Sequence, residues 1–249
     1  MSDNLTRPER PADLDRSSVA RYIQLATLFR HRIAAGQWPI GSQIPTLKDL
    51  VSECGVARAT VRQAISVLAS EGLVSRFRAK GTFVRDAPSQ FHIELTTDWQ
   101  GLLNPRAGAI INILEDEADV APPKMRHDIG NPAAKYRRVK RLHLHAGRPV
   151  LVADLYVDAS VAYRLDQDVY RTTTAMRLAS ALDGVQIVDA HQTLTIGAAD
   201  IELARLLDLP LNAPICHVDR SAVDQHGRLI VISKGVYRGD VVRLDLKLR

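Results

Sequence analysis

Apolar residues in the first third of the chain recur every three or four positions, the period of an amphipathic helix packed on one face. Ser17 and Ser18 are predicted to cap the first such helix, and Gly36 is predicted to end it. Its apolar face consists of Ile23, Ala26, Phe29 and Ile33. That face requires a partner, so we expect further helices nearby.

Two shorter helical segments follow. The segment 47–54 begins after Thr46, and the spacing from Thr46 to Asp49 is typical of a capping box. The next segment lies between Gly55 and Gly72. Its apolar stripe consists of Val61, Ala64, Ile65 and Leu68. Two short helices joined by a tight turn that contains glycine predict a helix-turn-helix unit.

Beyond Gly72 the period changes from helical to alternating. Residues 73–77 and 82–84 are predicted to form a hairpin, with Arg78 and Lys80 in its turn. After a segment typical of a linker, alternating stretches resume and are interrupted by helical stretches near 176–182 and 198–207. The alternating stretches are 109–114, 136–144, 150–157, 187–196, 215–223 and 229–237. This order predicts an α+β domain built on a mostly antiparallel sheet.

Composition narrows the class of protein. The 249 residues are 46% hydrophobic and 24% charged, which excludes a mainly disordered or collagen-like chain. No apolar run approaches the roughly 18 residues of a membrane span, and the N-terminus lacks the apolar core of a signal peptide, so we expect a cytoplasmic protein. Cys54 and Cys216 are isolated in the sequence. They indicate buried free thiols and no disulfide framework or zinc knuckle.

The net charge of +5 is concentrated in one segment. Residues 16–86 carry a net +7, whereas residues 1–15 carry −2 and residues 87–249 are neutral. A basic unit beside a neutral one indicates a nucleic-acid reader joined to a second domain, although a solvated basic face would give the same count. The predicted organisation is a tail (1–15), a basic helix-turn-helix domain that includes the hairpin (16–85), a linker (86–92) and a second domain (93–249). The family resemblance described below implies a winged helix-turn-helix for the first domain, and effector binding and dimerisation for the second.

The third predicted helix carries the polar residues that a DNA reader requires. Arg58, Thr60 and Arg62 lie in its first turn and a half, off the apolar stripe, where a recognition helix contacts base edges. Arginine at such a position can donate two hydrogen bonds to guanine O6 and N7. Arg78 and Lys80 would bring two further cations to phosphates or to the minor groove.

Five short blocks in this region resemble, in order and spacing, the winged-helix domain of GntR-family transcription regulators. They are Tyr22-x-Gln24, Gly36-x-Trp38-x-x-Gly41-x-x-Ile44-Pro45, Val56-x-Arg58-x-Thr60-Val61-Arg62-x-Ala64, Glu71-Gly72-Leu73-Val74 and Lys80-Gly81-Thr82-Phe83-Val84. The resemblance covers about residues 20–85 and implies a set of DNA contacts. These are Lys48, Arg58, Thr60, Arg62, Arg78, Lys80 and Gly81.

Two positions depart from the family pattern. Ala57 stands where the family usually has serine, which removes a helix cap worth about 1 kcal/mol and a bond to phosphate. Ala79 stands where the family usually has glycine, so the turn of the wing and its approach to the minor groove are expected to differ.

The second domain resembles the effector domain of the HutC branch, which is similar in fold to chorismate lyase. The resemblance spans roughly residues 93–246. It rests on Arg138-Val139-Lys140-Arg141-Leu142, Gly147-x-Pro149-Val150, Ala198-Ala199-x-x-x-x-Ala204-x-x-Leu207 and Ser233-Lys234-x-x-Tyr237-Arg238-Gly239-Asp240. It implies a small-molecule pocket on one face of the sheet. The implied effector-binding residues are Arg141, His143, Thr174, Met176, Lys234 and Tyr237.

The resemblance implies that Arg141 holds an anionic group. Relatives that bind phosphosugars tend to have polar residues where this chain has His143, Ala153, Met176 and Val231. A sugar phosphate needs many directed hydrogen bonds, so these replacements predict a smaller or partly aromatic carboxylate, with His143 as a second partner. The alternative for Arg141 is an ion pair at the surface.

Other chemistries have weaker support. His143 and His145 on one strand face could begin a metal site with His191 or Asp154, but the spacing fixes no third ligand, and we expect neither metal nor cofactor. An enzyme similar to chorismate lyase would need a carboxylic acid beside the anion clamp, where Ala153 stands.

The combined patterns predict a regulator of transcription that is not an enzyme. We expect a homodimeric repressor that binds a near-palindromic operator in double-stranded DNA and leaves it when a small carboxylate-type effector binds. A ligand-dependent activator, or an enzyme that carries a DNA-binding arm, is the alternative.

Overall fold

The computed structural model describes residues 19–85, 92–95, 99–103 and 109–245. The chain divides into two compact units, Met1–Gln90 and Phe91–Arg249. Each unit has a hydrophobic core of its own. No helix in the described ranges is both long enough and apolar enough to cross a membrane.

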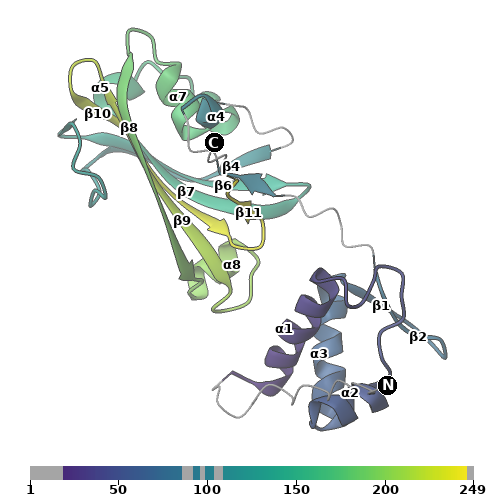
Figure 1. Ribbon diagram of the computed structural model, residues 1–249. Helices are drawn as coiled ribbons and strands as arrows, with labels where there is room; N and C mark the ends of the chain where they lie inside the picture. Colours follow the sequence, from purple (N-terminus) through teal and green to yellow (C-terminus); the bar gives the residue numbers. More distant parts are fainter. Residues whose placement is uncertain (1–18, 86–91, 96–98, 104–108, 246–249) are drawn as a thin grey trace, which may run out of the picture. The chain divides into compact units, whose positions relative to one another are not determined.

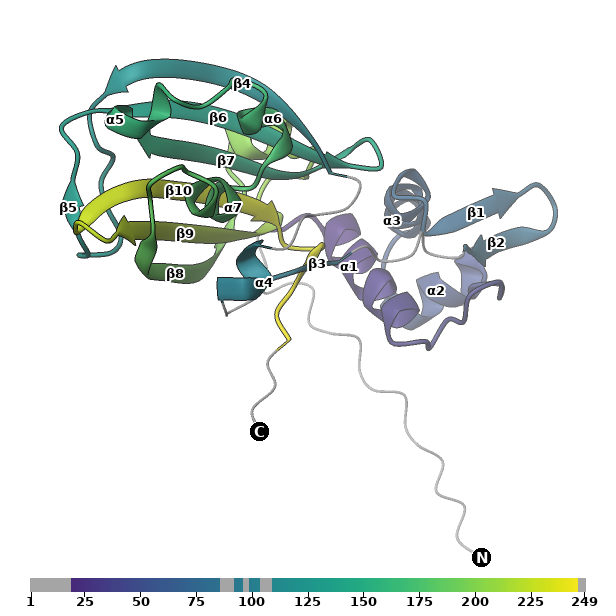
Figure 2. The ribbon, with the colours of Figure 1, turned by 90° about the horizontal axis from the view of Figure 1, so that it is seen from above.

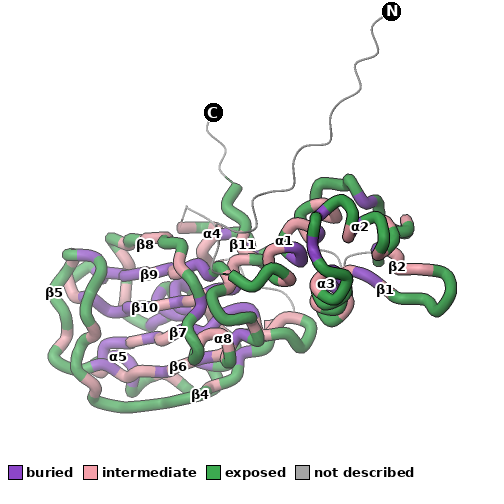
Figure 3. Tube along the Cα trace, turned by 90° about the horizontal axis from the view of Figure 1, so that it is seen from below, coloured by how far each residue is buried: buried purple, intermediate pink, exposed green. Residues whose placement is uncertain are grey.

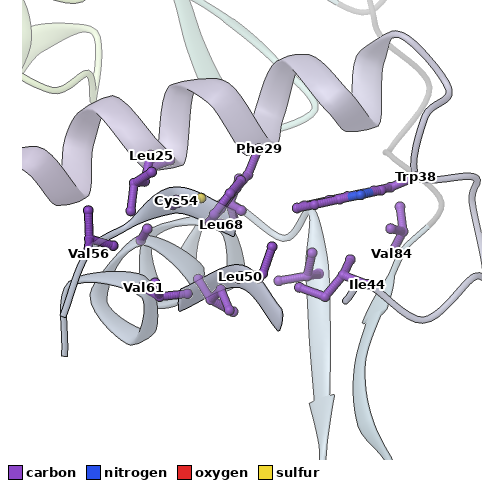
Figure 4. Close-up of a cluster of buried hydrophobic side chains, with 14 residues drawn as sticks. Leu25, Phe29, Trp38, Ile44, Leu50, Cys54, Val56, Val61, Leu68 and Val84 are labelled. Atoms are coloured by element: carbon purple, nitrogen blue, oxygen red, sulfur yellow. The ribbon is translucent and has the colours of Figure 1, made fainter. Parts of the chain in front are cut away.

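The first unit contains three helices followed by a hairpin (Figure 1). They are α1 (Arg21–Ala34), α2 (Leu47–Cys54), α3 (Arg58–Ser70), β1 (Val74–Phe77) and β2 (Gly81–Val84). The two strands are antiparallel. The helices bury Leu25, Leu50, Val61 and Leu68 between them (Figure 4), and α1 and α3 are the helix pair with the most extensive contact. The predicted helix-turn-helix arrangement with its hairpin is therefore confirmed.

Two capping signals predicted from the sequence are present at the ends of α2. The capping box of Thr46 and Asp49 is present, and hydrogen bonds from Thr46 lower the pKa of the Asp49 carboxyl. Gly55 ends α2 in the left-handed conformation, with φ of 65°. Helix α1 begins after Ala20, which offers no side-chain cap. Ser17 and Ser18 lie outside the described residues.

The second unit is built on a seven-stranded sheet (Figure 2). Six strands run in the order β4-β6-β7-β10-β9-β8, and every neighbouring pair is antiparallel. They are β4 (Ala109–Val120), β6 (Tyr136–His145), β7 (Arg148–Asp158), β10 (Arg228–Arg238), β9 (Pro214–Asp224) and β8 (Ile187–Ala198). The short β5 (Asn131–Pro132) pairs with β10 in parallel. A mostly antiparallel α+β domain is therefore confirmed.

The two faces of this sheet are covered differently. Side chains alternate between the faces of a strand, so directly paired residues share a face. The α7 face carries Val139 and Leu155 and is covered by α4 (Trp99–Leu103), α6 (Val169–Thr172) and α7 (Ala175–Ser180). The paired strands β3 (Ile93–Glu94) and β11 (Val242–Arg243) cover the same face around Tyr237.

The opposite face, called here the α8 face, carries Leu142, Val152 and Val236 and packs against α8 (Ile201–Leu206). A further short helix, α5 (Ala159–Ala162), follows β7 directly and is capped by Asp158. Buried residues concentrate in the central strands β7, β9 and β10, as the purple segments of Figure 3 show.

The edge strand β4 is mostly exposed and is irregular. Its pairing with β6 shifts register between Ile113 and Glu115 and again between Glu117 and Val120. Its acidic side chains bind arginines of β6, since Arg137 donates to Asp116 and Arg138 donates to Glu115 and Glu117.

Candidate functional site

Helix α3 presents a basic surface because its apolar stripe is fully used inside the unit. Val61, Ala64, Ile65 and Leu68 are all buried, as predicted. Arg58 and Arg62 lie off this stripe and are exposed, and Thr60 is half-buried. Within the part of the chain that the structure describes, neither guanidinium forms a hydrogen bond or ion pair. Both cations are thus available to an anionic partner in solvent.

The first turn of α3 lacks a side-chain cap. Ala57 occupies the cap position in an extended conformation and forms no side-chain hydrogen bond. The first backbone N–H groups of a helix attract anions when no protein group satisfies them. Lys48, near the start of α2, is exposed as well. The departure from serine noted in the sequence therefore leaves this helix start without a hydroxyl.

A third arginine joins the hairpin to α3. The Arg76 guanidinium in β1 donates from Nη2 to the backbone oxygen of Arg62 (3.1 Å) and to Ser66 Oγ (2.8 Å). Ser66 Oγ also donates to the Arg62 oxygen. In the sequence, Arg76 contributed only to the net positive charge of residues 16–86. The structure shows that Arg76 joins the β1–β2 hairpin to α3.

The turn of the wing carries the two exposed cations Arg78 and Lys80. Between them Ala79 has φ of 60°, in the left-handed region that glycine adopts far more readily. Gly81 also has a positive φ of 110°, and a Cβ there would stand 2.3 Å from Gln43 Nε2. The positive φ favours glycine at 81, whereas the end of the flexible Gln43 side chain could move to admit a Cβ.

In the second unit, Arg141 lies on β6 and faces α6 and α7. Its side chain is 1% exposed, and Nη1 donates to the backbone oxygens of Thr173 (2.8 Å) and Tyr170 (3.2 Å). Nε is buried without a hydrogen-bond partner. Among the described residues no carboxylate pairs with it. Burial lowers its pKa from 12.5 to about 10. The alternative of an ion pair at the surface is therefore wrong.

Two hydroxyl groups near the same residues share this lack of partners. Thr174 occupies the cap position of α7 but makes no capping bond, and its Oγ1 is buried without a hydrogen-bond partner in the described structure. Tyr170 Oη is also buried without a hydrogen-bond partner in the described structure. The Tyr170 ring is held by Arg137, whose guanidinium lies 4.8 Å from the ring centroid. Buried polar groups normally find partners, so these atoms indicate a place for a polar ligand.

A second buried arginine belongs to this neighbourhood and was missed in the sequence. Arg220 on β9 is 7% exposed. Its Nε donates to Gln192 Oε1 (2.7 Å) and its Nη1 donates to Tyr237 Oη (3.3 Å). Tyr237 is 1% exposed and also lies close enough to Arg141 to affect its pKa. The alternation of β9, in which Val218 and Ala222 are buried, was the signal that placed Arg220 on the same face.

The structure also places the other predicted effector residues. His143 is buried and lies on the α7 face, two residues from Arg141 along β6. Met176 is buried in α7, within the apolar cluster that includes Val139 and Leu155. The side chains of His143 and Met176 therefore lie on the same side of the sheet as that of Arg141.

Lys234 does not join this group. It lies one residue from Gly235 and three from Tyr237, so strand alternation turns it to the α8 face. Its Nζ donates to the backbone oxygen of Lys124 (2.7 Å). The expectation that Lys234 and Tyr237 both line the same pocket is wrong. They are three positions apart, and residues an odd number of positions apart on a strand point to opposite faces of the sheet.

The alternative metal site is not assembled. Asp154 lies on the α8 face and binds Arg138, and His191 lies on that face too, whereas His143 is on the α7 face. A search of the described residues finds no group of three potential ligands.

On the α8 face, the segment that follows β4 is anchored by a buried histidine. The His127 ring nitrogens lie 2.9 Å from Ser221 Oγ and 2.9 Å from Thr193 Oγ1. Burial, followed by the nearby His191, lowers the pKa of His127 below its ordinary value. Both ring nitrogens of this histidine have partners, whereas Nε of Arg141 on the other face has none.

Comparison with known proteins gives matches to both units. Residues 21–84 match the family described as bacterial regulatory proteins, gntR family, and residues 110–243 match the UTRA domain. The HTH-type transcriptional repressor NagR of Bacillus subtilis (strain 168) is 24% identical over 227 residues, which are 90% of this chain and 93% of NagR. A histidine utilization repressor of Pseudomonas putida is 24% identical over 216 residues, 84% of each chain.

Among solved structures, YydK from Bacillus subtilis subsp. subtilis str. 168 superposes with a TM-score of 0.51. It is 19% identical, and the match covers 93% of this chain and all of YydK. At this identity the match speaks for the fold.

Proposed function

The chain belongs to the GntR family, in the branch that carries a UTRA domain. From this premise we propose that it is a DNA-binding transcriptional repressor and not an enzyme, like the relatives named repressors. We further propose that it binds a near-palindromic operator as a homodimer and is released by a small carboxylate-type effector. We place this activity in the cytoplasm, where the operator is.

The proposed DNA contacts follow from exposure and charge. Arg58 and Arg62 read base edges in the major groove, since both are exposed off the buried stripe of α3. Thr60 and Lys48 contact the phosphate backbone, and the wing brings Arg78 and Lys80 to it. A two-fold dimer doubles this small surface, which is why we expect two half-sites related by symmetry.

The proposed effector site is the buried polar cluster formed by Arg141, Tyr170, Thr174, Arg220 and Tyr237. The observation that carries it is the Arg141 guanidinium, 1% exposed, with Nε unsatisfied and no carboxylate partner among the residues described. A buried cation without a counter-ion is costly, and an anionic ligand offsets that cost. A carboxylate fits the planar fork of an arginine and can accept two bonds from it.

The surroundings favour a ligand with few hydroxyl groups. Ala153, Met176 and Val231 are all buried and apolar. A sugar would leave its hydroxyls without partners beside them. His143 is proposed as a second polar contact, because it lies on the same face two residues away. Binding would change the placement of the two winged helices and weaken operator affinity by a coupling free energy of about 1 to 3 kcal/mol.

The test begins with operator selection from random duplex DNA, followed by a thermal-shift screen of small carboxylates and sugar phosphates. A carboxylate that raises the melting temperature is expected to release the operator in fluorescence anisotropy. Arg141→Ala is expected to abolish release and to keep DNA binding. Arg177→Ala, an exposed arginine on α7, is the matched control and should respond like the wild type.

Two results would count against the effector assignment. One is a screen in which only amino-sugar phosphates raise the melting temperature. The other is operator release that survives in Arg141→Ala.

A further inference from the structure

The buried polar cluster contains two guanidinium groups. Arg141 on β6 lies directly beside Ala153 on β7, which lies beside Gly235 on β10. Gly235 in turn pairs with Val218 on β9, and Arg220 is two residues further along that strand. Both arginines therefore project from the α7 face, on either side of two small residues.

Ala153 and Gly235 leave space above the sheet, and larger side chains of neighbouring residues occupy the space over Gly235. A Cβ at Gly235 would lie 3.3 Å from Tyr237 Cε2 and 3.2 Å from Leu151 Cδ1, so the Tyr237 ring lies close over this glycine. The ring brings its hydroxyl to Arg220 Nη1 at 3.3 Å. Tyr237 is thus near both guanidinium groups, and its strand lies between the strands that carry them.

Neither arginine is neutralised by the protein. Arg220 donates to the neutral Gln192 and Tyr237, and Arg141 donates to backbone oxygens. Across the described ranges, no carboxylate forms an ion pair with either. Other arginines of this unit do have one, since the buried Arg238 binds Asp240 and the partly buried Arg138 binds Asp154. Two buried cations without counter-ions need negative charge from elsewhere.

We propose that the effector carries two separated anionic groups, one held by Arg141 and one by Arg220 on the other side of Tyr237. This inference rests on the proposed effector site and sharpens it from a carboxylate to a dianion. Strands lie about 4.8 Å apart, and the arginines project from strands three places apart in the sheet. Tyr237 lies near both guanidinium groups, so the gap between them is shorter than three strand spacings, and the ligand class is a short dicarboxylate of about four to six carbons.

The experiment compares each dicarboxylate with its own monoamide, which has nearly the same shape and one charge less. The probes are succinate, glutarate and adipate with succinamate, glutaramate and adipamate, measured by isothermal titration calorimetry on the full chain at constant ionic strength. For at least one pair we expect the dicarboxylate to bind wild type about tenfold more tightly.

Variants then assign that difference to a residue. Arg220→Gln is expected to bring the two members of the pair to equal affinity, because Gln keeps a polar contact but loses the charge. Arg220→Lys restores the charge and is expected to recover part of the preference. Arg141→Gln should weaken the dicarboxylate and the monoamide alike. Arg177→Gln on the exposed side of α7 serves as the control and should match wild type.

The inference is overturned if wild type binds all three pairs with equal affinity or none of them, or if Arg220→Gln keeps the wild-type preference. The wild-type comparison needs no variant, so poor folding of Arg220→Gln does not prevent this outcome. Failure of the proposed function has a different signature. In that case Arg141→Gln leaves the binding of every probe unchanged and operator release survives in Arg141→Ala.

Discussion

The two units of this chain use arginine in opposite ways. On α3 of the first unit, Arg58 and Arg62 stand in solvent beside a helix whose apolar stripe is buried. On the sheet of the second unit, Arg141 and Arg220 are 1% and 7% exposed. In neither place does a carboxylate of the described residues neutralise the guanidinium.

The difference determines what each cation can recognise. A solvent-exposed cation is attracted to any phosphate chain nearby, and dissolved salt screens this attraction. A buried cation can be reached only by a ligand that enters the fold, and it discriminates strongly because a wrong ligand leaves it unpaired. The same residue type therefore serves a long polyanion in one unit and one small anion in the other.

The first prediction concerns the two exposed arginines of α3. Arg58→Ala and Arg62→Ala should each weaken operator binding by about 1 to 3 kcal/mol if they read bases, and sequence preference should relax at the contacted position. The fold should be retained, since neither side chain is buried. Gel shifts and circular dichroism measure the two effects. Unchanged affinity in both variants would remove the assignment of α3 as the recognition helix.

The second prediction sharpens how the exposed cations of the wing are held. Ala79→Gly should stabilise the chain by about 0.5 to 1 kcal/mol, because glycine adopts the positive φ of this turn without the clash of a Cβ. Ala59→Gly in α3, where the backbone is helical, is the opposite control and should destabilise by about 1 kcal/mol. Urea unfolding measures both. Equal destabilisation by the two changes would mean that Ala79 is not strained.

The third prediction concerns a buried ionisable group that already has partners. His127 has its pKa lowered by burial from the ordinary 6.5, with His191, Asp219 and Arg126 as charged neighbours. The unfolded chain therefore takes up a proton before the folded chain does. Stability should be complete above about pH 6.5 and should fall as the pH drops below it.

In His127→Gln this part of the pH dependence should disappear, while the remaining pH dependence is retained. Urea unfolding at pH 7.5 and pH 5.5 for both proteins gives the comparison. Identical pH dependence in the two proteins would show that His127 does not titrate on unfolding.

Local signals predicted the first unit well. The capping box at Thr46, the glycine turn at Gly55 and the stripe on α3 are encoded within a few residues, and each one formed. The serine caps predicted for α1 lie outside the described residues and stay a prediction.

The second unit was harder to predict, because its cluster joins residues from strands that are distant in sequence. The order of the strands determines which residues lie side by side, and that order cannot be read from a single sequence. Arg220 was therefore overlooked, although its own strand pattern showed its face. Lys234 was misplaced for a simpler reason, since strand alternation alone separates it from Tyr237.

The acidic edge of the sheet has a consequence for how the folded protein meets other chains. An exposed edge strand offers unpaired backbone groups to other chains, and this is a route to aggregation. In β4 the acidic side chains of Glu115, Asp116 and Glu117 and the two shifts in register make a regular match with a foreign strand unfavourable. We therefore expect this edge to resist pairing with a strand of another chain.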